Sequence, residues 1–251
     1  MNSDCCEIES QVENVSLYKK IKVALLFALI TVAGITCINL PSCTSWEYLR
    51  LQHIGTLLLV IPLLYDSVKN RMPMSAYVGI VLFALLHVIG ARWIYSYVPY
   101  REWSISLGVP ANYWGVPTDF HGDLGAFFER CVLDGKVGFR NHYDRLIHFS
   151  FGLLMFPCLL YKACKWVEKK SMVAILVAWL LIQTGSMIYE IFEWQLSVWS
   201  KGGDAYNGQQ GDIWDAQKDM ALAMLGSMIM VLFNVIKDRC INPHHTKGET
   251  K

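Results

Sequence analysis

The residues of this chain best suited to chemistry are carboxylates and histidines that lie inside apolar segments. They form three sets with helical spacing: Asp144 and His148; Glu190 and Glu193; and Asp212, Asp215 and Asp219. Because residues three or four apart share one face of a helix, each set predicts a single polar stripe. Ionisable side chains are costly inside a bilayer, so they usually face the protein interior and indicate a functional site.

The predicted stripes contain more acids than bases. The acids are Asp144, Glu190, Glu193, Asp212, Asp215 and Asp219, and the bases are Arg92, Arg145 and Lys218. Carboxylates packed close together repel one another unless protons or a cation relieve them. A divalent metal would do so, because carboxylates and imidazole together suit iron, manganese or zinc. The predicted metal ligands are Glu190, Glu193, Asp215, Asp219 and His148.

One hypothesis for this pocket is an enzyme that acts on a lipid or lipid-linked substrate. His148 or Asp219 would be the general base, and Arg145 or Arg92 would contact a phosphate group. The candidate catalytic residues are therefore His148, Asp219 and Arg145. Two alternatives stay open. Intramembrane acids and histidines also form proton relays in transporters, and part of the cluster could instead cap helices or form ion pairs that fix their packing.

The elements that must position these residues are membrane-spanning helices. The chain has 251 residues, of which 54% are hydrophobic and 17% charged, with a mean hydropathy of +0.32, which is more apolar than a soluble domain of this length. A net charge of +1 without a Lys/Arg block predicts no nucleic-acid partner. The apolar runs do not alternate as barrel strands do, so we expect an all-α bundle. Six stretches approach the length of a span: 21–40, 50–66, 74–97, 144–162, 171–197 and 216–236.

The orientation of the spans follows from their flanking basic residues. With six spans, the Lys/Arg clusters at 19–22, 69–71, 162–170 and 237–239 all fall on one side. That side is expected to be cytoplasmic, which places both termini inside and the loops 41–49, 98–143 and 198–215 outside. The first span could alternatively be a cleaved lipoprotein signal that ends at Cys43, but Pro41 fits that pattern poorly and an uncleaved span is expected.

The predicted domain organisation is simple. We expect a polar tail over 1–18, one integral-membrane domain over 19–239 with a long outer loop at 98–143, and a second polar tail over 240–251. Counting along each helix from its outer end places Arg92, His148, Glu193 and Asp219 roughly 10 Å below those ends, with His87 deeper. The predicted pocket therefore opens to the outer face.

Four stretches of the chain resemble a known family. They are residues 87–99 (HVIGARWIYSYVP), 141–152 (NHYDRLIHFSFG), 189–194 (YEIFEW) and 211–220 (GDIWDAQKDM). These stretches are similar to the YjdF family of bacterial inner-membrane proteins. The resemblance implies a multi-pass helical protein of the bacterial inner (plasma) membrane that shares a polar set which includes His87 and Tyr95, but it implies no activity. The candidate substrate-binding residues are then His87, Arg92, Tyr95 and Asp144.

A fainter likeness involves residues 144–149 (DRLIHF) alone. This run is similar to VanZ-like membrane proteins, a resemblance that would imply a role in the cell envelope or in the response to glycopeptides.

Overall fold

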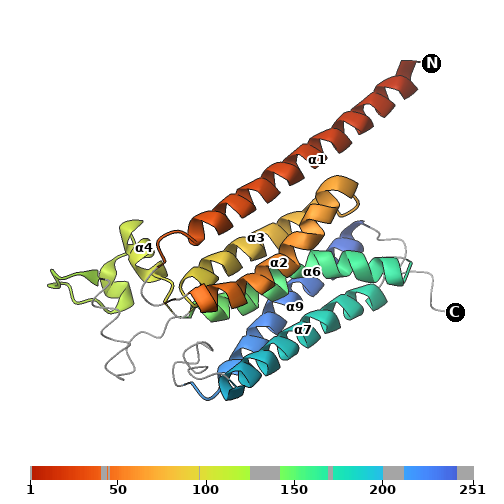
Figure 1. Ribbon diagram of the computed structural model, residues 1–251. Coiled ribbons are helices and arrows are strands. Elements are labelled where there is room, and N and C mark those ends of the chain that lie inside the picture. The colour runs from red at the N-terminus through yellow and green to blue at the C-terminus, as the bar shows by residue number, and fades with distance from the viewer. Residues whose placement is uncertain are drawn as a thin grey trace.

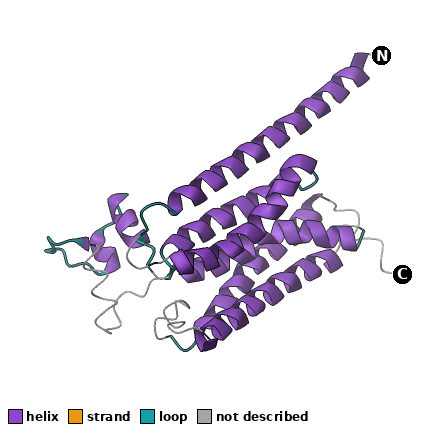
Figure 2. Cartoon of the chain, viewed as in Figure 1, coloured by secondary structure: helices purple, strands orange, loops and turns teal. Residues whose placement is uncertain are grey.

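The fold is a bundle of long helices. The computed structural model describes residues 2–40, 44, 46–95, 97–124, 142–168, 172–199 and 212–241, and all regular structure within these ranges is helical (Figure 1, Figure 2). The prediction of an all-α protein is therefore confirmed. The helices are α1 (Asn2–Thr36), α2 (Trp46–Lys69), α3 (Met74–Arg92), α4 (Tyr100–Ser106), a 3-10 turn η1 (Ala111–Trp114), α6 (Tyr143–Trp166), α7 (Met172–Trp199) and α9 (Asp215–Ile241).

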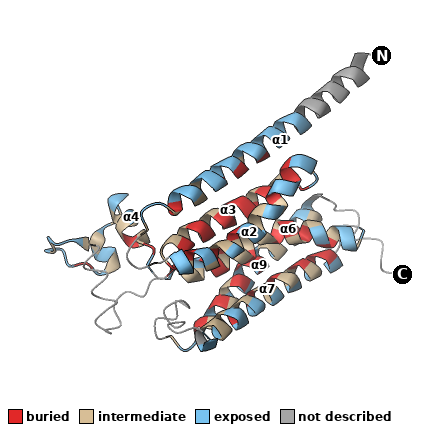
Figure 3. Ribbon diagram, in the orientation of Figure 1, coloured by how far each residue is buried: buried red, intermediate tan, exposed pale blue. Residues whose placement is uncertain are grey.

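Five of the described helices, α2, α3, α6, α7 and α9, are long and apolar enough to cross a membrane. They coincide with five of the six predicted spans. Most of the remaining predicted span, 21–40, lies in α1, which packs against α2 and α3 and is exposed along much of its length (Figure 3). The prediction of a multi-pass helical membrane protein is confirmed.

Helix α6 is the centre of the bundle, because it packs against α3 on one side and against α7 and α9 on the other. Glycine allows the α6 and α9 backbones to approach closely. A β-carbon at Gly152 would collide with the carbonyl oxygen of Ala223 and lie 2.8 Å from the backbone nitrogen of Ser227. In the same way, a β-carbon at Gly226 would collide with the carbonyl oxygen of Phe149. Such small residues are how membrane helices come close enough for strong van der Waals packing.

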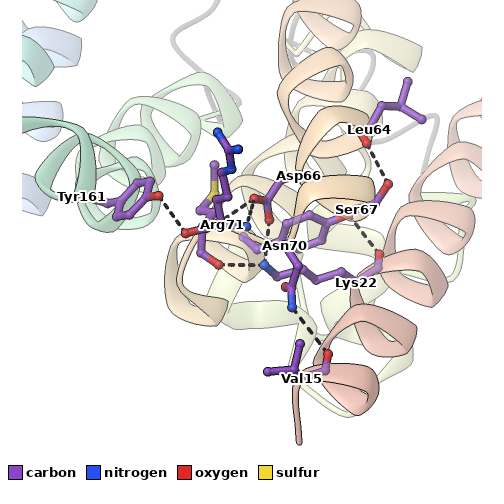
Figure 4. Close-up of polar contacts among 10 residues, drawn as sticks. Val15, Lys22, Leu64, Asp66, Ser67, Asn70, Arg71 and Tyr161 are labelled. Carbon is purple, nitrogen blue, oxygen red and sulfur yellow. Dashed lines mark hydrogen bonds and ion pairs between the residues drawn. The ribbon is translucent and has the colours of Figure 1, made fainter. Parts of the chain in front are cut away.

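A buried ion pair joins α1 to α2 (Figure 4). Lys22 Nζ lies 2.7 Å from Asp66 Oδ2, and the two residues are 1% and 3% exposed. Asp66 Oδ1 also accepts hydrogen bonds from the backbone nitrogens of Arg71 and Met72, at 2.8 and 2.7 Å. The sequence pattern places Lys22 in a basic cluster that flanks a span. The structure shows instead a charge inside the helix packing, because its partner arrives from another helix.

Helix α3 ends earlier than predicted, at Arg92 and not at residue 97. The chain reverses at Ile94 and Tyr95, which have φ of 47° and 51°, and the Tyr95 nitrogen donates to the Gly90 carbonyl oxygen at 2.8 Å. Gly90 permits this reversal, because a β-carbon there would lie 2.5 Å from the Tyr95 ring. The reversal ends the helix and turns Tyr95 back towards its body.

The predicted outer loop, 98–143, contains two short helical segments, α4 and η1. Aromatic residues hold these two turns together. The Trp114 indole nitrogen donates to Ser104 Oγ at 2.7 Å, and the rings of Tyr100 and Trp114 pack edge to face with centroids 5.8 Å apart. The hydroxyl of Tyr100 in turn accepts a hydrogen bond from the backbone nitrogen of His142, at the start of α6. Residues 125–141 of the predicted loop lie outside the described part of the chain.

Candidate functional site

Acids and a histidine from three helices meet near one end of the bundle. Asp144 and His148 come from α6, Glu190 from α7 and Asp219 from α9. His148, Glu190 and Asp219 are buried, and Asp144 is partly buried. These four residues are called the carboxylate–histidine cluster below. Their helices bring them together because the glycine contacts of α6 lie one turn from His148 and one to two turns from Asp219.

The distances within the cluster are short. His148 Nε2 lies 3.1 Å from Glu190 Oε1 and 3.9 Å from Asp144 Oδ1. Asp144, His148 and Asp219 each offer one ligand atom such that all three atoms lie within 4.8 Å of one another. On its other side, His148 Nδ1 lies 3.5 Å from Ser186 Oγ.

The imidazole of His148 and the carboxylate of Glu190 have an unusual environment. His148 Nε2 and Glu190 Oε1 are buried, and neither makes a hydrogen bond of good geometry with the described residues, although they lie 3.1 Å apart. Buried polar atoms in proteins normally have partners, so such a pair needs an explanation. An imidazole nitrogen that converges with carboxylate oxygens from other helices is the donor set with which helical bundles bind divalent metals.

A rim of ion pairs lies beside the cluster. Arg145 lies 2.6 Å from Asp212 Oδ2 and 3.7 Å from Asp215 Oδ1, and Lys218 Nζ lies 2.7 Å from Asp212 Oδ2. Asp212 Oδ1 also accepts a hydrogen bond from the Trp214 backbone nitrogen at 3.0 Å. Asp212 therefore also caps the start of α9, which is the role that the capping alternative gives to part of the cluster. Two of the three predicted bases are therefore engaged by these outer acids.

His87 and Tyr95 form a second polar group on α3 and the turn after it. The Tyr95 hydroxyl lies 2.6 Å from His87 Nδ1, and His87 Nε2 lies 3.1 Å from the Gln52 carbonyl oxygen on α2. Since a carbonyl can only accept, Nε2 carries the proton and Nδ1 accepts from the tyrosine. This chain of hydrogen bonds holds the imidazole in one tautomer and orientation.

Substitution of Tyr95 by phenylalanine is expected to lower the free energy of unfolding by about 0.5–1.5 kcal/mol, because it leaves the buried His87 Nδ1 without its donor. Thermal unfolding of the detergent-purified protein measures this loss. Tyr113→Phe is the matched control, because Tyr113 is 75% exposed in the loop. Equal stability of Tyr95→Phe and Tyr113→Phe would contradict the role of this hydrogen bond.

An apolar cavity of about 220 Å³ separates the two polar groups. His87 and Tyr95 line it, and so do His148, Ser186 and Tyr189 from α6 and α7. Its remaining walls are glycines and apolar side chains of α2, α3, α6 and α7: Gly55, Leu58, Leu59, Phe83, Ile147, Phe151 and Gly185. His148 thus faces both the carboxylates and an apolar space.

The structure places most of the predicted site residues around this cavity and cluster. Asp144, His148, Glu190 and Asp219 form the cluster, Arg145 and Asp215 lie on its rim, and His87 and Tyr95 lie across the cavity. Glu193, on α7 one turn beyond Glu190, is partly buried; its carboxylate accepts a hydrogen bond from Tyr189 and lies close enough to the acids of the cluster to interact with them.

Arg92 is the exception among the predicted site residues. Its guanidinium donates to the carbonyl oxygens of Thr36, Ile38 and Asn39 at 2.7–2.8 Å, so it caps the end of α1. The placement of Arg92 10 Å inside the outer end of its helix was wrong, because α3 ends at this residue. Its hydrogen bonds thus go to backbone carbonyls at the end of α1.

Ser186 and Tyr189 also line the cavity, although neither was among the predicted site residues. Ser186 could have been found by extending the stripe of Glu190 and Glu193 by one turn towards the start of α7, since residues four apart share a face. Tyr189 packs its ring against that of His148, with centroids 5.6 Å apart. No spacing rule would have predicted that contact.

Comparisons with known proteins agree on one family. The model of a family described as predicted membrane protein (DUF2238) matches residues 21–239. The inner membrane protein YjdF of Escherichia coli (strain K12) is 30% identical over 190 residues, which cover 73% of this chain and 76% of the relative. No solved structure matches the chain.

Proposed function

The chain belongs to the DUF2238 family of predicted membrane proteins, and we propose that it is a metal-dependent enzyme that acts on a lipid or lipid-linked substrate. One observation carries the proposal. Ligand atoms of Asp144, His148 and Asp219 converge within 4.8 Å, and His148 also lines an apolar cavity between the helices. A metal beside an apolar cavity is suited to a substrate with a polar head and a hydrocarbon tail.

The proposed metal ligands are Asp144, His148 and Asp219, with Glu190 beside them. A bound metal would polarise the bond to be broken and lower the pKa of an attacking water. Glu190 is then the general base. Its Oε1 lies 3.1 Å from His148 Nε2, so it would be within hydrogen-bond reach of the attacking water on a metal held by His148. This assignment differs from the predicted general base, since His148 and Asp219 serve as ligands.

The substrate is proposed to place an apolar segment in the 220 Å³ cavity and a polar head at the rim. Leu58, Leu59 and Phe83 provide the apolar wall, and Arg145, whose ion pairs with Asp212 and Asp215 hold it on the rim, would contact a phosphate. We propose that this end of the bundle faces outwards from an inner membrane and that both termini are cytoplasmic. The basic residues Arg71, Lys162 and Lys165 at the opposite end support this orientation.

Metal analysis of the detergent-purified protein tests the proposal. After incubation with manganese, zinc or ferrous iron and removal of excess ion, the natural sequence is expected to retain one of these metals. His148→Ala and Asp219→Asn are expected to reduce its retention at least roughly tenfold. Asp119→Asn, which removes an exposed carboxylate from the loop, is the matched control and is expected to retain the metal.

Two outcomes would contradict the metal site: no retained metal in the natural sequence, or the same loss in Asp119→Asn. Thermal unfolding of the metal-free variants separates this function from a packing role. A functional cluster predicts that Asp219→Asn keeps or gains stability without metal, because functional sites are often optimised at the expense of stability. A large loss of stability would favour ion pairs that only fix helix packing.

A further inference from the structure

A second cavity, of about 260 Å³, lies at the opposite end of the bundle from the carboxylate–histidine cluster. Its polar wall contains three cations, Arg71 from the turn between α2 and α3, and Lys162 and Lys165 from the last turns of α6. Its apolar wall includes Leu58 and Leu59, which lie two to three turns inside α2. The cavity thus runs from charged helix ends towards the apolar middle of the bundle.

The cations of this cavity are not neutralised by its own acid. Asp66 is the carboxylate that lines the cavity, and it is already paired with Lys22 and with two backbone nitrogens (Figure 4). Among the described residues, no carboxylate forms an ion pair with Arg71, Lys162 or Lys165. Within the described part of the chain, the cavity therefore has a positive wall that is not paired with a carboxylate.

Contacts between α6 and the α2–α3 turn hold this positive wall together. The Tyr161 hydroxyl donates to the Arg71 carbonyl oxygen at 2.7 Å, which ties the turn to α6 (Figure 4). Lys165 Nζ lies over the Tyr161 ring, 4.5 Å from its centroid. The three cations are thereby presented from two sides of one space.

We propose that this cavity binds the phosphate headgroup of an anionic phospholipid. Basic pockets between membrane helices are typical sites for such headgroups. A lipid fits better than a soluble phosphate because the cavity continues along Leu58 and Leu59, and Leu58 is 69% exposed on a face of α2 that also presents Ile54 and Ile61. An acyl chain would lie along this face while its phosphate contacts Arg71, Lys162 and Lys165.

Lipid retention by the purified full chain tests this site. The protein in detergent is mixed with equal amounts of phosphatidylglycerol and phosphatidylcholine, and bound lipid is counted by native mass spectrometry. The natural sequence is expected to retain phosphatidylglycerol preferentially. The triple variant Arg71→Gln, Lys162→Gln and Lys165→Gln is expected to retain it roughly tenfold less, since each basic residue adds to anionic lipid binding.

The matched control removes three exposed lysines elsewhere, Lys19→Gln, Lys20→Gln and Lys237→Gln, and is expected to keep the preference. An equal loss in this control would overturn a local site in favour of diffuse charge. Equal retention of the two lipids by the natural sequence would also overturn the proposal. This comparison does not depend on the triple variant, so it remains a test even if that variant fails to fold. Displacement of phosphatidylglycerol by millimolar inorganic phosphate would overturn the assignment to a lipid.

Discussion

Asp66→Asn is expected to lower the free energy of unfolding by roughly 3–5 kcal/mol, because the change leaves the ammonium of Lys22 buried without a counterion. Asparagine keeps a side-chain oxygen that can accept from the nitrogens of Arg71 and Met72, so the change tests the charge itself. Denaturation of the detergent-solubilised protein, followed by circular dichroism, measures the effect.

The double variant Lys22→Met with Asp66→Asn provides the decisive comparison. Removal of both charges leaves no unpaired ion, so this variant is expected to recover much of the lost stability. Asp119→Asn, on the exposed loop, serves as the control for loss of a carboxylate. If Asp66→Asn costs no more than about 1 kcal/mol, as is typical of exposed pairs, the ion pair does not hold α1 to α2.

Gly152→Ala is expected to lower the free energy of unfolding by roughly 1–3 kcal/mol, because the new methyl group has no space against the backbone of α9. The helices would have to move apart, and this movement would separate His148 on α6 from Asp219 on α9. We therefore expect the variant to lose stability and metal retention together. Thermal unfolding and metal analysis of the same preparation measure the two effects.

Gly34→Ala is the matched control for this substitution. A β-carbon at Gly34, on α1, would meet no other side chain or helix within 4 Å, so alanine there is expected to be neutral or to stabilise the helix by up to about 1 kcal/mol. If Gly152→Ala were as stable as Gly34→Ala, the close approach of α6 and α9 would not be a requirement of the fold.

Helical spacing predicted which acids and histidines share one face of a helix. The spacing of Asp144 and His148 predicted one stripe on α6, and both residues belong to the cluster. Spacing cannot tell which helices face each other, since that depends on side-chain shape along their whole length. The pairing of Lys22 with Asp66 joins residues 44 positions apart, and neither residue has a neighbour in sequence that predicts it.

The end of α3 shows a second limit of sequence reasoning. The apolar run before Pro99 predicts a helix to residue 97, although the chain already reverses at Ile94 and Tyr95. Neither residue type favours a positive φ, so no local signal marked the turn. Because the predicted helix was too long, Arg92 was expected to lie inside it, at the level of the pocket, whereas α3 ends at this residue.

The contacts of α1 have a consequence for how this protein is made. Lys22 bonds to Asp66 and to the Met72 carbonyl oxygen, and the carbonyls at the end of α1 bond to Arg92. Since synthesis proceeds from the N-terminus, every one of these partners leaves the ribosome after α1 does. Helix α1 therefore cannot complete these contacts until α2 and α3 have been synthesised. Its final docking follows the synthesis of α2 and α3, although α1 precedes both in the chain.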